Sequence, residues 1–97
     1  MSLRGKIVVK KNFTNGGLYT KFHGESGRLY YADLKPRHAS TLTEYECNIF
    51  PCTTEGDNNS GIEWDCNVYK KQCDDTTPNT LRKCVEAFLG YPVDMVC

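Results

Sequence analysis

The sequence predicts a small, disulfide-rich, mainly β domain, and two observations carry this prediction. All six cysteines of the 97-residue chain lie between Cys47 and Cys97, and an even number of cysteines in so short a chain is typical of a secreted disulfide framework. The first 46 residues contain no cysteine and alternate short apolar segments with glycine-rich turns. We therefore expect one domain over 1–97, with a cysteine-free antiparallel meander over 1–46 and a disulfide-stapled half over 47–97.

Three strands are expected in the first half, over 6–13, 18–22 and 28–34. The segment Asn15-Gly16-Gly17 is a hairpin turn signal between the first two strands, and residues 23–27 form a second turn. Pro36 is expected to end the third strand. Packing must hold this meander together, and the expected contributors are Ile7, Val9, Phe13, Leu18, Phe22, Leu29 and Tyr31.

The second half is expected to contain two more strands and a surface loop. Residues 41–50 alternate in polarity, which predicts a strand that carries Cys47 into the core. Residues 53–61 are polar and rich in turn-forming residues, which indicates a loop. Over 62–68, Ile62, Trp64, Cys66 and Val68 alternate with polar residues, which predicts a half-buried strand.

One short helix is expected over 80–89. Leu81, Cys84, Val85 and Phe88 recur at helical spacing, and Asn79 or Thr80 is the expected cap at its start. Gly90 and Pro92 should end it.

The cysteines are expected to form three bridges, and sequence leaves about 15 pairings open. They are Cys47, Cys52, Cys66, Cys73, Cys84 and Cys97. Zinc is disfavoured because no second close pair of cysteines or histidines follows Cys47 and Cys52. The acidic segments at 57–59 and 74–75 do not match a calcium-binding loop, so we expect neither a metal nor another cofactor.

Composition and charge describe a folded, extracellular domain. The formal net charge is +0, but residues 1–46 carry eight Lys/Arg against four acids, and the cysteine half has the opposite balance. This asymmetry can steer the chain toward an acidic partner, whereas it is too weak to argue for nucleic acid. No apolar run is long enough to cross a membrane. We expect a secreted monomer whose signal peptide has been removed; the sequons at Asn12 and Asn58 fit that location.

Two sets of residues are candidates for function. Arg28, Tyr30, Tyr31, Lys35 and Arg37 lie within ten residues and have the side chains that most often carry interface energy. Because neighbours on a strand face opposite ways, at most one of the two tyrosines should pack inward. The alternative is an acid–base set for a small ribonuclease, with His23 and His38 moving protons, Glu25 acting as a base and Arg28 holding phosphate.

The cysteine half resembles the small salivary proteins of ticks called the 8.9 kDa family, which are related to single von Willebrand factor type C domains. The residues that carry this resemblance are Cys47, Cys52, Cys66, Tyr91-Pro92 and the closing Cys97. The chain departs from the family in having six cysteines where eight are usual. The resemblance implies secretion and binding to a host protein, and members of that family include inhibitors of complement.

We therefore expect a secreted protein-binding module that inhibits a host defence protein, such as a complement component, by steric blockade and without enzymatic activity. A small ribonuclease or toxin that uses His23, Glu25 and His38 is the alternative.

Overall fold

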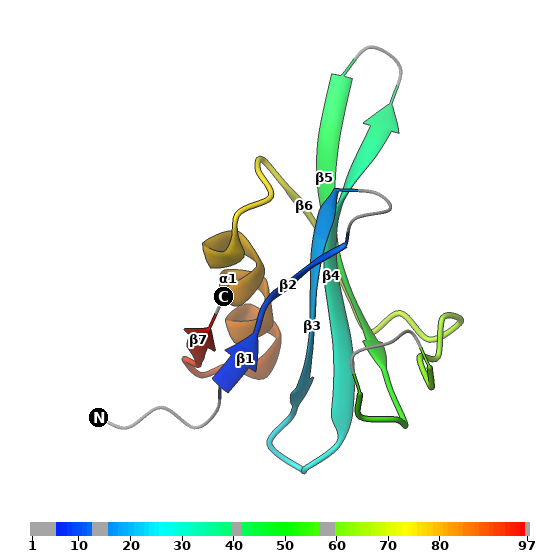
Figure 1. Ribbon diagram of the computed structural model, residues 1–97, viewed down its shortest axis with the longest axis vertical. Coiled ribbons are helices and arrows are strands. Elements are labelled where there is room, and N and C mark those ends of the chain that lie inside the picture. Colours follow the sequence, from blue (N-terminus) through cyan, green and yellow to red (C-terminus); the bar gives the residue numbers. More distant parts are fainter. Residues whose placement is uncertain (1–5, 13–15, 40–41, 57–59, 97) are drawn as a thin grey trace.

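The computed structural model describes residues 6–12, 16–39, 42–56 and 60–96, and Figure 1 shows their arrangement. A five-stranded antiparallel sheet has the order β2-β3-β4-β5-β6. Its strands are β2 (Lys10–Asn12), β3 (Gly17–His23), β4 (Leu29–Ala39), β5 (Leu42–Pro51) and β6 (Tyr69–Cys73). Helix α1 (Pro78–Leu89) lies against one face, beside a parallel pair of short strands, β1 (Lys6–Val8) and β7 (Asp94–Val96). The mainly β class with one helix is therefore confirmed.

The expected first strand is divided in two. Val9 separates β1 from β2, and its amide donates a 2.8 Å hydrogen bond to the carbonyl of Val96. This bond turns the chain toward β7, so that β1 leaves the sheet while β2 stays paired with β3.

The third strand runs past Pro36, where we expected it to end. Pro36 pairs with Tyr45 of β5, whereas the last residue of β4 that pairs with β3 is Leu34. Beyond Leu34 the described residues pair with this strand on one side only, so a residue without an amide proton is tolerated there. In Figure 1 this part of the β4–β5 hairpin extends beyond the rest of the sheet.

The prediction of a strand over 62–68 is wrong. Residues 63–66 form a turn, with the amide of Cys66 bonded to the carbonyl of Glu63 at 3.0 Å, and the fifth strand of the sheet begins only at Tyr69. Ile62 is buried, but Trp64 is 50% exposed and Val68 44% exposed. Only the ends of the segment bond to β5: Ile62 forms an isolated bridge with Cys52, and the Val68 amide donates to the carbonyl of Ile49. Ile62 and Trp64 cover the sheet from a turn.

The helix is confirmed, and it begins earlier than expected. Thr77 is its cap and accepts a hydrogen bond from the amide of Thr80, while Pro78 occupies the first turn, where its fixed φ favours helix. Gly90 ends the helix in the left-handed region with φ 86°. None of the described helices is long and apolar enough to span a membrane.

Each face of the sheet carries its own hydrophobic cluster. The larger cluster lies between the sheet and α1 and includes Leu34, Ile49 and Leu81, all with 0% exposure. The smaller cluster lies on the opposite face, which we call the outer face, and its members are Tyr31, Phe50, Cys52 and Ile62. The loop between β5 and β6 covers part of this outer face.

Several predictions fall on parts of the chain that are not described. Phe13, Asn58 and Cys97 lie outside the described residues, and so do the side chains of Asn12, Arg37 and His38.

Candidate functional site

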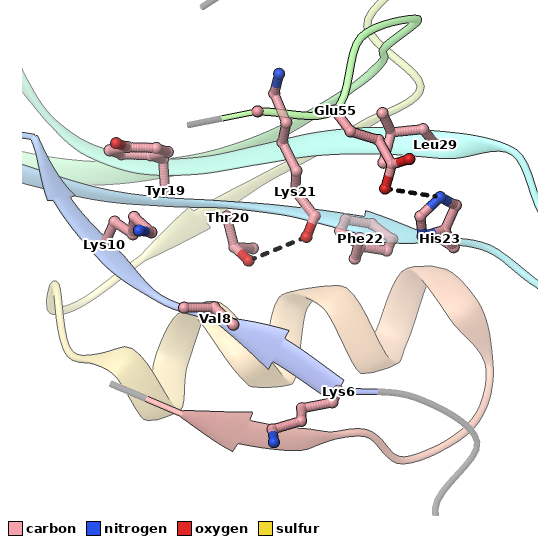
Figure 2. A pocket seen from close by; sticks show the side chains of 11 residues that line it. Lys6, Val8, Lys10, Tyr19, Thr20, Lys21, Phe22, His23, Leu29 and Glu55 are labelled. Atoms are coloured by element: carbon pink, nitrogen blue, oxygen red, sulfur yellow. Dashed lines mark hydrogen bonds and ion pairs between the residues drawn. The ribbon is translucent and has the colours of Figure 1, made fainter. Parts of the chain in front are cut away.

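The second half of β3 has an open edge. β2 pairs only with Gly17–Tyr19, so no strand in the described ranges pairs with the outward edge of residues 20–23. β1 approaches this edge but belongs to the separate pair with β7. An open edge presents unpaired amide and carbonyl groups to another extended segment. In Figure 2 the Lys21 carbonyl accepts a 3.4 Å hydrogen bond from the Thr20 hydroxyl, which is a weak local substitute for a strand partner.

A groove runs along this edge. One hollow of about 240 Å³ lies between β3 and the Lys6–Lys10 segment, and Figure 2 shows Lys6 and Val8 across from the edge. A second hollow of about 440 Å³ continues past the end of β3 toward Leu89 and Tyr91. Lys6, Phe22 and His23 line both hollows, so the two adjoin. We call the two hollows together the β3 groove.

The rim of the β3 groove is mainly basic. Its first hollow is lined by Lys6, Lys10 and Lys21 together with Glu55, and the second hollow adds Glu25, so three lysines and His23 line the groove with two acids. The Lys21 ammonium donates a 2.6 Å hydrogen bond to the carbonyl of Thr54, so it also holds the loop that follows β5 against the sheet. This balance of charge favours an acidic occupant over a basic one.

The structure does not bring the residues of the expected acid–base set together. His23 lines the groove, with its Nε2 3.6 Å from a carboxylate oxygen of Glu55, and Glu25 lines the second hollow. His23 is opposite Leu29 in the sheet, whereas His38 lies nine residues further along β4. At about 3.3 Å per residue this separates the two backbones by about 30 Å.

The five residues expected as a recognition surface do not share one face. Tyr30 faces α1 and stacks on Phe22, with ring centroids 5.6 Å apart, whereas Tyr31 is 2% exposed on the outer face. Both tyrosines therefore pack, and the expectation that only one would do so is wrong because both faces carry a cluster. Arg28 is exposed at the β3–β4 turn, and Lys35 is half-buried on the outer face.

A buried carboxylate on the outer face was missed by the sequence analysis. Asp33 is 6% exposed and hydrogen-bonds with Tyr31 and Asn48, but its Oδ1 has no partner among the described residues. Burial raises the pKa of Asp33 to about 6, against an opposing effect of the Lys35 ammonium. The sequence could have indicated this contact, because Asp33 follows Tyr31 by two residues and residues i and i+2 of a strand share a face.

The described cysteines carry free thiols in this structure, and these are Cys47, Cys52, Cys66, Cys73 and Cys84. Cys47, Cys73 and Cys84 gather between the sheet and α1, and their sulfurs are joined by hydrogen bonds. Cys52 lies on the outer face and donates to the carbonyl of Thr54 at 3.3 Å, whereas Cys66 is exposed. The three-bridge framework stays a prediction.

Within the described ranges, no group of three or more His, Cys, Asp or Glu side chains is placed to hold a metal ion. No protein-family model, no curated protein and no solved structure matches this chain.

Proposed function

We propose that this protein is an extracellular binding module that takes an extended segment of another protein along the open edge of β3. The observation that carries the proposal is the edge of residues 20–23, with which no described strand pairs, and the groove beside it. Addition of a strand to such an edge gives affinity through main-chain hydrogen bonds, and the neighbouring hollows give specificity through side chains.

The occupant proposed is acidic. Lys6 and Lys10 line the side of the groove opposite β3, and Lys21 and His23 extend from β3 itself. Aspartate or glutamate side chains on a bound segment would meet these cations. The excess of Lys/Arg in residues 1–46 would also speed encounter with an acidic partner.

Inhibition would follow by steric blockade. A segment held along β3 is covered by this domain and is unavailable to other proteins, and a rigid small domain loses little freedom on binding. The choice of a host defence protein, such as a complement component, rests on the resemblance of the cysteine half to the tick salivary family. Plasma is therefore the first source in which to seek the partner.

The test uses a displayed library of acidic ten-residue peptides, with binders selected on the immobilised full chain. Lys6→Glu should weaken binding at least tenfold, because it reverses a charge that lines both hollows. Lys83→Glu is the matched control, since it makes the same charge change on the exposed side of α1, away from the groove. Hydrogen exchange should show new protection of amides within residues 20–23 when a selected peptide is bound.

Two results would contradict the proposal. One is that the selected peptides bind Lys6→Glu with the same affinity as the unchanged chain. The other is that bound peptide protects amides elsewhere from hydrogen exchange while residues 20–23 exchange as before. Capture from plasma follows with the same two variants as baits. A protein that is retained by the unchanged chain and by Lys83→Glu, but lost with Lys6→Glu, is the partner that the proposal requires.

A further inference from the structure

Three cysteines from three different elements meet under α1. Cys47 lies in the middle of β5, Cys73 ends β6, and Cys84 lies on the buried side of α1. The Sγ atoms of Cys73 and Cys84 are 3.7 Å apart, and the Cys47 thiol is hydrogen-bonded to Cys84. Cys84 is therefore the member that contacts both of the others.

Strand register separates Cys47 from Cys73. Cys73 is opposite Tyr45 and Cys47 is opposite Lys71, so the two cysteines are diagonal neighbours on adjacent strands. Diagonal neighbours have Cα atoms about 7–8 Å apart. A disulfide usually needs about 4.4–6.8 Å between Cα atoms, so a direct Cys47–Cys73 bridge is disfavoured. Three thiols at this position can thus form one bridge, and Cys84 must belong to it.

The hydrogen bonds also decide where negative charge resides. Thiol hydrogen bonds from Cys47 and then from Cys73 lower the pKa of Cys84 to about 6, although burial opposes this. The pKa of Cys47 is raised by its hydrogen bond to Cys84 and by burial, and burial raises the pKa of Cys73 to about 11. The thiolate of this group therefore resides on Cys84, and a thiolate is the form that attacks a disulfide formed at its neighbour Cys73.

Exposure indicates where an oxidant can enter. Cys47 is 0% exposed and Cys84 is 2% exposed, whereas Cys73 is half-buried at the end of β6. A small molecule in solution can thus reach Cys73 first.

We infer that Cys73 and Cys84 form a thiol–disulfide site that is oxidised by low-molecular-weight disulfides, with Cys47 as a second, mutually exclusive partner for Cys84. With glutathione disulfide, the Cys73 sulfur attacks one glutathione sulfur, and the Cys73 proton leaves with the first glutathione that is released. The Cys84 thiolate then attacks the Cys73 sulfur of this mixed disulfide and releases the second glutathione as a thiolate, which takes a proton from water. The protein loses two electrons and glutathione disulfide gains them.

Exchange with Cys47 needs no further oxidant. The Cys47 sulfur attacks Cys84 and expels Cys73, whose sulfur takes up the proton that Cys47 has lost. The bridge then joins α1 to β5, where before it joined α1 to β6, and the end of β6 carries a free thiol.

The test is to equilibrate the full chain in glutathione buffers of increasing oxidising strength, quench it with acid, alkylate the free thiols and map the bridges by mass spectrometry. A Cys73–Cys84 bridge should be the first to form. In Cys73→Ser, Cys84 should pair with Cys47, and in Cys47→Ser the Cys73–Cys84 bridge should persist. Cys66→Ser is the matched control. Cys66 is exposed, so its substitution should leave the order of bridge formation unchanged.

The inference would be overturned if Cys84 stayed a free thiol at every redox potential of the glutathione buffers. It would also be overturned if Cys84 paired first with Cys52, Cys66 or Cys97. Circular dichroism of each variant shows whether it is folded; Cys73→Ser and Cys66→Ser replace side chains that are not fully buried, so they carry the test if Cys47→Ser is unfolded. The result does not depend on the proposed function, since mapping the bridges requires no binding partner.

Discussion

Tyr31 and Asp33, two residues apart on β4, share a hydrogen bond on the outer face of the sheet, and both are buried there. Burial raises the pKa of the Tyr31 hydroxyl, and the Asp33 carboxylate raises it further. The hydroxyl thus stays protonated and donates to the carboxylate. The Oδ1 atom of Asp33, without a partner in the described part of the chain, is what makes the ionised form costly here.

The Asp33 carboxyl should make the protein more stable in mild acid. Its pKa is about 6 in the folded protein and 3.8 for an ordinary aspartate, so the folded state binds the proton more tightly. The stability contributed by the protonated form is complete below the lower value and is lost as the pH rises through the upper one, by about 3 kcal/mol in total. Asp33→Asn should remove this loss and stabilise the protein by about 1–3 kcal/mol at neutral pH.

Urea unfolding across this pH range measures the effect. Lys35, Tyr31, Glu46 and Cys47 are titratable groups that interact with Asp33. Asp65→Asn is the control, because Asp65 is exposed and should leave the pH profile unchanged. A variant Asp33→Asn with the same pH profile as the unchanged protein would refute this assignment.

Trp64 should stabilise the outer cluster although half of its surface is exposed. Its ring lies edge-on to Tyr31 at 5.6 Å and to Phe50 at 5.1 Å. Aromatic contacts of this kind contribute about 0.5–1.5 kcal/mol each beyond area burial, so Trp64→Ala should cost about 2 kcal/mol. Val68→Ala, at a similarly exposed position, should change stability by less than about 0.5 kcal/mol. Equal losses in urea unfolding, followed by circular dichroism, would show that the ring contacts contribute nothing.

Gly90 should be required for the end of α1 because of its backbone conformation alone. Its φ is 86°, and no heavy atom lies within 4 Å of the position that a Cβ would occupy. Gly90→Ala should therefore cost about 1 kcal/mol through backbone strain without a clash. Gly90→Asn should cost less, since asparagine adopts this conformation more readily. The order of unfolding midpoints, glycine above asparagine above alanine, is the result to check.

Substitution of His23 distinguishes the proposed binding function from the ribonuclease alternative. Its pair with Glu55 joins side chains that are 52% and 77% exposed, so His23→Ala should change stability by less than about 0.5 kcal/mol. We expect no cleavage of a labelled RNA by the purified chain. Cleavage that is lost in His23→Ala, while folding is retained, would instead establish the ribonuclease.

Local pattern determined much of the fold. The alternation in 18–22 and 28–34 and the helical spacing of Leu81, Cys84 and Val85 each depend on neighbouring residues, and the structure has a strand or helix at each of these segments. Burial of Ile7, Val9, Leu18 and Phe22 was predictable for the same reason.

The tertiary structure alone decided the pairing of β1 with β7, because residues 6–8 and 94–96 lie at opposite ends of the chain and no local signal joins them. That pairing draws β1 away from β3, and the open edge with its groove is the result. The meeting of Cys47, Cys73 and Cys84 likewise needs three elements to be placed together. Sequence therefore determined which segments form strands and helix, whereas contacts between distant segments determined which edge stays open and which thiols meet.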